Sequence, residues 1–170
     1  AIPVLAVGLA VASGWMGLRA NPRHPPRLPA PQPDCQIKPE EVAVIIAAHN
    51  EGGSIGKCLA AATKVVPPER IYVGSDGSDD DTVPVARSWG CNVWDIRPNR
   101  GKARALKGLM DVYRLTERYK ALVILDADSV MDEHYLERAL PMFNDGSVAA
   151  VAGHAFPAWF QHALPRGAMF

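Results

Sequence analysis

Residues 121–128, with the sequence ALVILDAD, decide the fold of this chain. The first five are a continuous apolar run, which is typical of a strand buried on both faces. Because side chains alternate along a strand, Asp126 and Asp128 should project to the same side. Two neighbouring carboxylates repel each other unless a cation lies between them, so the pair suits Mg²⁺ or Mn²⁺. A polar strand end that caps the next helix is the structural alternative, and the pair alone does not decide between the two.

Similar units flank this stretch on both sides. Further strands are predicted at 42–48, 70–74, 92–96 and 148–152. Helices are predicted between them, at 54–64, 79–90, 102–118 and 132–143. Strands that alternate with helices at roughly 25-residue intervals predict an α/β fold, with a mostly parallel sheet and helices on both faces.

Two segments precede this alternating pattern. Residues 1–18 carry no charge, and arginines follow from Arg19 onward. This favours a transmembrane anchor with the rest of the chain on the cytoplasmic side of the plasma or inner membrane, over a signal peptide or a buried helix. Residues 19–39 are rich in proline and predict an extended linker. The globular domain is predicted from residue 40 to residue 170.

Composition narrows the choice of partners. The chain has 18 Lys and Arg against 18 Asp and Glu, so no excess positive charge favours nucleic acid. Its three cysteines are far apart and lack metal-ligand spacing. We interpret Cys58 and Cys91 as packed thiols and assign no chemistry to Cys35.

Polar residues follow four of the predicted strands. Ligands of parallel sheets bind beyond the carboxyl ends of the strands, so these loops should share one edge. There Asn50, Glu51 and Asp76 can hydrogen-bond a base and a ribose. Lys102 opens a helix, where an ammonium group and free N–H groups suit a diphosphate. The structural alternatives are an Asx turn at Asp76 and a solvated lysine at position 102. His49 is interpreted as structural.

Four strings in this order resemble the family 2 glycosyltransferases, which are inverting enzymes with the GT-A fold. They are VAVIIAAHNEGGSIGKCL at 42–59, GSDGSDDDT at 74–82, NRGKARALKGLM at 99–110 and VILDADS at 123–129. The resemblance runs from about residue 42 to residue 153 and covers the nucleotide-binding half of that fold. A membrane segment before the domain further resembles the polysaccharide synthases of the family.

The resemblance implies a nucleotide-sugar donor, with UDP as the expected carrier, and a saccharide or lipid-linked acceptor. Asn50 and Glu51 match the nucleoside-contacting loop, and Asp76 matches the acid that faces the base or ribose. Lys102 matches the basic residue near the phosphates. Many family members carry an acid where this chain has Ser75, which leaves the base preference open.

For the reaction itself, Asp126 and Asp128 match the DxD motif that handles the donor and its Mg²⁺ or Mn²⁺, with Asp128 the expected direct ligand. The family's general base lies in a later acidic motif, which we expect beyond Phe170. Two other functions fit parts of the sequence. One is a non-catalytic nucleotide-sugar-binding module. The other is a phosphatase of the haloacid dehalogenase type, with Asp126 as nucleophile and Asp128 as acid, although that fold carries its motif on the first strand.

Overall fold

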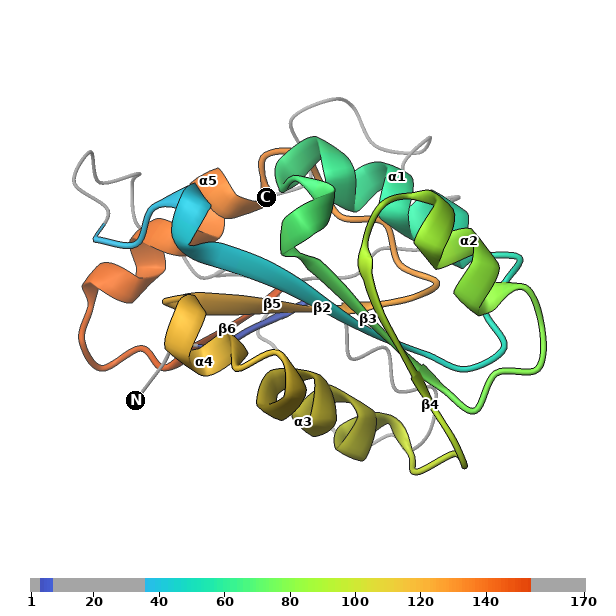
Figure 1. Ribbon diagram of the computed structural model, residues 1–170. Coiled ribbons are helices and arrows are strands. Elements are labelled where there is room, and N and C mark those ends of the chain that lie inside the picture. Colours follow the sequence, from blue (N-terminus) through green and yellow to red (C-terminus); the bar gives the residue numbers. More distant parts are fainter. Residues whose placement is uncertain (1–3, 8–35, 154–170) are drawn as a thin grey trace, which may run out of the picture.

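The computed structural model describes residues 4–7 and 36–153 (Figure 1). Its described strands form one six-stranded sheet in the order β4-β3-β2-β5-β1-β6. All five strand pairings are parallel. The strands are β1 (Val4–Val7), β2 (Val42–Ala48), β3 (Ile71–Asp76), β4 (Asn92–Ile96), β5 (Ala121–Asp126) and β6 (Ala150–Gly153).

Helices pack on both faces of this sheet. One face carries α1 (Ile55–Val65), α2 (Thr82–Ser88) and α5 (Tyr135–Ala139), and the other carries α3 (Lys102–Val112) and α4 (Leu115–Arg118) (Figure 1). Three 3₁₀ turns complete the described elements: η1 (Pro39–Glu41), η2 (Pro68–Arg70) and η3 (Leu140–Asn144). The predicted parallel α/β sheet with helices on both faces is confirmed.

Strand β2 shows why both faces need covering. Val42, Val44 and Ile46 belong to the core under α1, whereas Ala43 and Ile45 belong to the core under α3. None of the five exposes any surface. Fully burying a valine or isoleucine side chain contributes roughly 1.5–3 kcal/mol, so the continuous apolar run stabilises both layers at once.

Two predicted helices are shorter than expected. The helix predicted over 102–118 breaks because Arg114 adopts the left-handed conformation, with φ 53°, between α3 and α4. The helix predicted over 132–143 gives way to η3 after Ala139. Pro141 has no N–H to continue the α-helical bonding, which explains the change.

Strand β1 lies inside the segment 1–18, where the sequence predicts a transmembrane helix. It pairs with β5, Val4 opposite Leu122, and with β6 on its other side. These four residues therefore form a strand and not a helix, and a short apolar run has no periodicity that separates the two. The rest of 1–18 lies outside the described residues, as do 19–35 of the predicted linker and 154–170 of the predicted domain. Within 4–7 and 36–153, no helix is long and apolar enough to cross a bilayer.

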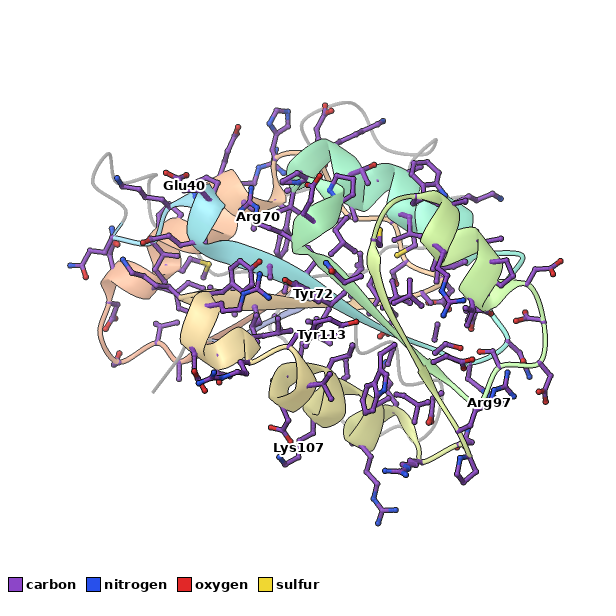
Figure 2. The ribbon with its side chains drawn as sticks, viewed as in Figure 1. Glu40, Arg70, Tyr72, Arg97, Lys107 and Tyr113 are labelled. Carbon is purple, nitrogen blue, oxygen red and sulfur yellow. The ribbon has the colours of Figure 1, made fainter. Side chains whose placement is uncertain are left out.

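Helix α3 lies close against the sheet. A Cβ added at Gly108 would come within 2.3 Å of the Trp94 ring on β4, and one at Gly74 would come within 3.0 Å of Leu109. Farther along this layer, the rings of Tyr72 and Tyr113 pack 4.9 Å apart between centroids (Figure 2). These contacts set the height of α3 above the sheet, and with it the position of the helix N-terminus.

Candidate active site

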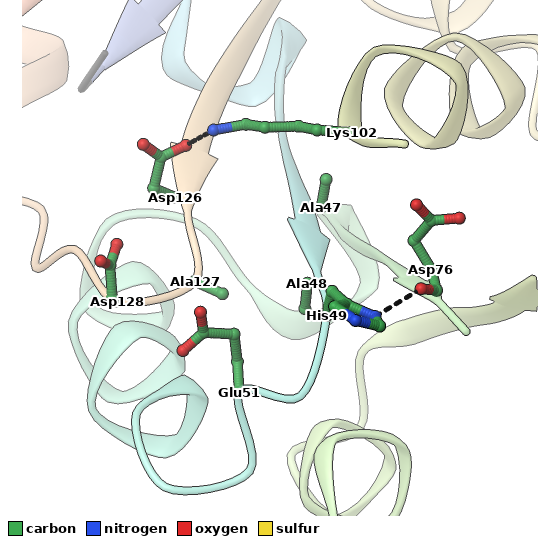
Figure 3. Close-up of a pocket in the computed structure, with 9 residues that line it drawn as sticks. All are labelled: Ala47, Ala48, His49, Glu51, Asp76, Lys102, Asp126, Ala127 and Asp128. Atoms are coloured by element: carbon green, nitrogen blue, oxygen red, sulfur yellow. Dashed lines mark hydrogen bonds and ion pairs between the residues drawn. The ribbon is translucent and has the colours of Figure 1, made fainter. Parts of the chain in front are cut away.

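A pocket of about 240 Å³ opens at the carboxyl ends of β2, β3 and β5 (Figure 3). Its lining comprises Ala47, Ala48, His49, Glu51, Asp76, Lys102, Asp126, Ala127 and Asp128. Five of the six residues that the sequence predicts for the site are among them. The loops after these strands and the start of α3 therefore share one edge of the sheet, as expected for a parallel α/β fold.

Asp76 lines the pocket, yet its carboxylate already has two partners. One oxygen accepts the N–H of Arg100 and the other accepts the N–H of Gly101, each at 2.7 Å. The side chain of Asn99 donates to the Asp76 carbonyl oxygen at 2.9 Å. Only 3% of Asp76 is exposed, so its charge is buried and stabilised by backbone donors. The carboxylate thereby fixes the loop that leads into α3.

Gly77 allows this loop to pack closely. Its φ is 71°, a conformation that side chains rarely adopt, and an added Cβ would meet the Asn99 backbone nitrogen at 2.9 Å. The Gly77 N–H donates to the carbonyl oxygen of Ile96 at 2.8 Å. A tight turn after β3 thus brings the loop after β4 against the pocket.

Asn50 is the one predicted site residue that does not line the pocket. Its side-chain oxygen accepts the N–H of Asp79 at 2.9 Å, and its own N–H donates to Ser78 Oγ at 3.1 Å. The Ser75 hydroxyl donates to the same Ser78 oxygen at 2.8 Å, and both serines are buried. Asn50 therefore joins the loop after β2 to the loop after β3, and Ser75 holds Ser78 in place for that contact. A nucleoside contact by Asn50 stays a prediction.

Glu51 reaches the pocket from the same joined pair of loops. Its N–H donates to Thr82 Oγ1 at 2.8 Å, and the Ser54 hydroxyl donates to its carboxylate. Asp80 accepts the N–H of Gly52 at 2.8 Å and the N–H of Thr82 at 3.0 Å. Hydrogen bonds to the carboxylate, the Thr82 hydroxyl first, lower the pKa of Asp80.

The Asp126 and Asp128 side of the pocket is less enclosed. Lys102, from the first turn of α3, forms an ion pair with Asp126 Oδ1 (Figure 3). Asp128 is exposed, and no ion pair or hydrogen bond joins its carboxylate to any described residue. Strand β5 ends at Asp126, and the Ser129 N–H donates to the Asp126 carbonyl oxygen at 3.0 Å to form a turn. Both aspartates line the pocket, Asp128 from this turn.

The next question is whether the carboxylates of Asp126 and Asp128 suit the predicted divalent cation. Nowhere in the described part of the chain do three or more His, Cys, Asp or Glu side chains gather into a group that could hold a metal ion. Asp126 and Asp128 nevertheless offer carboxylate oxygens, and Mg²⁺ commonly binds one or two carboxylates together with substrate phosphates. The residues therefore fit an ion that is shared with a phosphate ligand, and the metal stays a prediction.

Two neighbours of the site were not predicted for it. His49 lines the pocket, and its Nδ1 lies 2.7 Å from the Asp76 carbonyl oxygen. Since that oxygen only accepts, Nδ1 is the donor in this contact. Arg97 donates to the Ser78 carbonyl oxygen at 2.6 Å and pairs with Asp79 at 3.0 Å. His49 directly follows β2, and that position was the available signal, whereas nothing in the sequence marks Arg97.

Cys58 is packed, as the sequence predicts, and it contacts the backbone of Asp126. Its thiol is buried and lies 3.4 Å from the Asp126 carbonyl oxygen. Burial, with a smaller contribution from the charge of Asp128, raises the pKa of Cys58 to about 12. The thiol therefore stays protonated near neutral pH and takes no nucleophilic role.

A parallel sheet with four carboxylates and a lysine at its carboxyl edge places the chain among the α/β proteins that bind ligands at that edge. Comparison with known families identifies the group more closely. The family model described as glycosyltransferase like family 2 matches residues 39–164, and the chain belongs to this family.

Individual relatives agree with that assignment. The chain is 30% identical over 107 residues to a dolichyl-phosphate hexose transferase of Haloferax volcanii, which covers 63% of this chain and 45% of the relative. It is 34% identical over 93 residues to a 4,4'-diaponeurosporenoate glycosyltransferase of Staphylococcus aureus, which covers 55% of this chain and 24% of the relative. The chain thus spans less than half the length of these two relatives.

A solved structure resembles the fold. The crystal structure of Staphylococcus aureus TarS 1-349 superposes with a TM-score of 0.50 at 17% sequence identity, over 69% of this chain and 38% of that chain. At this identity the likeness concerns the fold alone.

Proposed function

We propose that this protein is an inverting glycosyltransferase that moves a sugar from a nucleotide-sugar, expected to be a UDP-sugar, to a saccharide or lipid-linked acceptor. One observation carries the proposal: in a chain of this family, Lys102, Asp126 and Asp128 line a single pocket at the carboxyl edge of the sheet. The name of the Haloferax relative favours a lipid-linked acceptor.

Different residues of the pocket would bind different parts of the donor. Lys102, at the N-terminus of α3, would bind the diphosphate, because helix N-termini and ammonium groups favour anions. Asp126 and Asp128 would hold Mg²⁺ or Mn²⁺, which when bound neutralises the charge that develops on the leaving diphosphate. Asp76 holds the loop before α3 and so keeps Lys102 beside the aspartates.

Transfer with inversion requires an acceptor hydroxyl to attack the anomeric carbon on the face opposite the diphosphate. The hydroxyl proton passes to a carboxylate base, the bond from the anomeric carbon to the phosphate oxygen breaks, and the nucleoside diphosphate leaves. Following the family resemblance, we expect this base beyond Phe170. The proposal extends to a site at the cytoplasmic face of the plasma or inner membrane and to a role in polysaccharide synthesis. Both rest on the family resemblance alone, since Val4–Val7 of the uncharged segment 1–18 form a strand.

The test is to incubate the full-length protein with a panel of UDP-sugars and Mn²⁺ and to measure release of UDP. We expect release from at least one UDP-sugar and a loss of at least about 100-fold in Asp128→Asn, because the variant loses a carboxylate proposed to hold the metal ion that neutralises the departing diphosphate. Asp111→Asn is the matched control, since Asp111 lies on α3 and pairs with Lys107.

Other outcomes would contradict the proposal. Hydrolysis of simple phosphate esters that depends on Asp126 would point to the phosphatase alternative. Tight UDP binding without turnover of any donor, in the presence of varied saccharide and lipid acceptors, would point to a non-catalytic binding module.

A further inference from the structure

The candidate active site contains one lysine or arginine among its lining residues, and that side chain already has a partner. Lys102 lines the pocket together with Glu51, Asp76, Asp126 and Asp128. The Asp76 carboxylate is held by two backbone N–H groups. Of the carboxylates in the pocket, Asp126 alone has an ion pair with Lys102. The cation expected to bind a diphosphate thus neutralises one of the two aspartates expected to bind a metal.

Binding a divalent ion at Asp126 while Lys102 is paired with it costs free energy. A divalent ion at Asp126 would lie beside the Lys102 ammonium group, and like charges at this range repel each other. Asp128 has no partner among residues 4–7 and 36–153, so an entering ion meets no competitor there. The pocket in its donor-free form therefore favours binding at Asp128 and opposes it at Asp126.

We propose that Lys102 couples metal binding to donor binding. Without a donor, it occupies Asp126 and weakens the hold of the pocket on the divalent ion. A diphosphate attracts the ammonium group, which releases Asp126 to the metal. This inference rests on the proposed function. It adds that the metal ion and the nucleotide each bind tightly only when the other is bound.

The surroundings of Lys102 suit this exchange. Its side chain is 47% exposed, whereas that of Asp126 is 18% exposed, so the flexible partner is the one with room to move. The helix beneath it is held by contact of Gly108 with the Trp94 ring and by the bonds of Asp76 to the preceding loop. The lysine can change partner while α3 stays in place. A half-exposed ion pair is weak, so a diphosphate can displace it.

Coupling of this kind is reciprocal. If UDP raises the affinity for Mn²⁺ by some factor, Mn²⁺ must raise the affinity for UDP by the same factor. Part of the factor arises from direct contact between metal and phosphate in any such site. The part due to Lys102 disappears when the lysine loses its charge, and that difference can be measured.

The experiment measures Mn²⁺ binding at constant pH and ionic strength, by the electron paramagnetic resonance signal of the free ion, with and without UDP. We compare the wild-type protein with Lys102→Met. We expect the variant to bind Mn²⁺ alone about three- to tenfold more tightly, because a half-exposed lysine no longer competes at Asp126. We also expect the enhancement of Mn²⁺ affinity by UDP to fall about tenfold, since the variant no longer holds the diphosphate.

Two further variants serve as controls. Lys102→Arg keeps the charge and should keep the weak binding of Mn²⁺ alone. Lys107→Met removes an exposed lysine that pairs with Asp111 on α3, outside the pocket, and should change nothing. Circular dichroism verifies that each variant is folded.

Unchanged or weaker binding of Mn²⁺ alone by Lys102→Met would overturn the coupling. If the wild type shows linkage between UDP and Mn²⁺ and the variant retains all of it, only the coupling fails. If the wild type binds no Mn²⁺ even with UDP, the coupling and the metal-dependent transfer fail together.

Discussion

The two sides of the pocket differ in how completely they are built. On the side of β2 and β3, Asn50 and Asp76 are bonded to neighbouring loops, and Ser75 is bonded to the turn after its own strand. Ser75 and Asp76 are buried. On the side of β5, Asp128 has no partner among the described residues and Asp126 has a half-exposed lysine. We infer that the first side is shaped in advance and that the second is completed by its ligand. Substitutions on the two sides should therefore fail in different ways.

The largest effect is expected at Asp128, on the open side. Asp128→Asn should reduce sugar transfer by about 10²- to 10³-fold, because it removes a carboxylate proposed to hold the metal ion that stabilises the charge developing on the diphosphate. Its stability should change by less than about 0.5 kcal/mol, because an exposed carboxylate without a partner holds nothing in place. UDP release and urea unfolding measured on the same preparation test both parts. A marked loss of stability would show that the open side is as structural as the other.

Asp76 should behave in the opposite way. Asp76→Ala removes the charged acceptor of the Arg100 and Gly101 N–H groups, of which Gly101 keeps a second acceptor in Asn99 Oδ1 at 3.1 Å. Bonds to charged groups contribute roughly 1.5–3 kcal/mol each. We expect a loss of about 3 kcal/mol in the free energy of unfolding, measured by urea titration. Asp79→Ala is the control, since the Asp79 side chain is 85% exposed, and it should cost far less. Equal losses in the two variants would contradict a rigid first side.

Ser75 offers a smaller test of the same side. Its hydroxyl donates to Ser78 Oγ, which also accepts the N–H of Asn50. Ser75→Ala removes one neutral bond within a buried set and should cost about 1 kcal/mol. Weaker UDP binding in isothermal calorimetry should accompany it if the loop after β3 carries the nucleoside. An unchanged affinity for UDP would separate the serine network from nucleotide binding.

The smallest expected effect is a pH dependence at Asp80. Its pKa is lowered from the ordinary 3.8 by bonds from Thr82 and Gly52. A lowered pKa means that this carboxylate stabilises the fold above pH 3.8, and that the contribution is lost as the pH falls through the lower folded-state value. Wild-type stability should therefore decline more steeply with acid below about pH 4 than that of Asp80→Asn. Parallel slopes in thermal melts across that range would count against the assignment.

Much of the fold could be predicted because its signals are local. The apolar run from Val42 to Ala48 needs cover on both faces, and the helices on either side supply it. The sequence does not predict where a helix ends when a single backbone angle determines the break. Arg114 ends α3 by adopting a positive φ, although nothing in its type requires that. The strand at Val4–Val7 depends on pairing with β5 and β6, which are more than 100 residues away in the chain. Such long-range pairing cannot be recognised from the local sequence around Val4–Val7.

Some features of the candidate site could also be predicted from the sequence, and others could not. That polar loops gather at one edge follows from parallel topology, so Glu51, Lys102, Asp126 and Asp128 could be predicted to lie together. The individual hydrogen-bond partners of these loops could not be predicted from the sequence. The amide oxygen of Asn50 accepts the N–H of Asp79, a bond that the sequence does not indicate, while the predicted nucleoside contact of Asn50 stays a prediction. Hydrogen-bond partners in loops depend on distances that only the packed structure sets.

The contact between Trp94 and Gly108 gives the protein a built-in optical probe. The indole ring lies where a single added carbon on α3 would strike it, so any shift of that helix alters the surroundings of the ring. Lys102 begins the same helix, so Trp94 emission would report whether α3 stays in place when a ligand draws Lys102 away from Asp126. Trp89 lies on the opposite layer of the sheet, just after α2, and is 36% exposed. With Trp15, Trp89 and Trp159 replaced by Phe, the emission of Trp94 alone would show whether α3 moves when a donor binds, without any added dye.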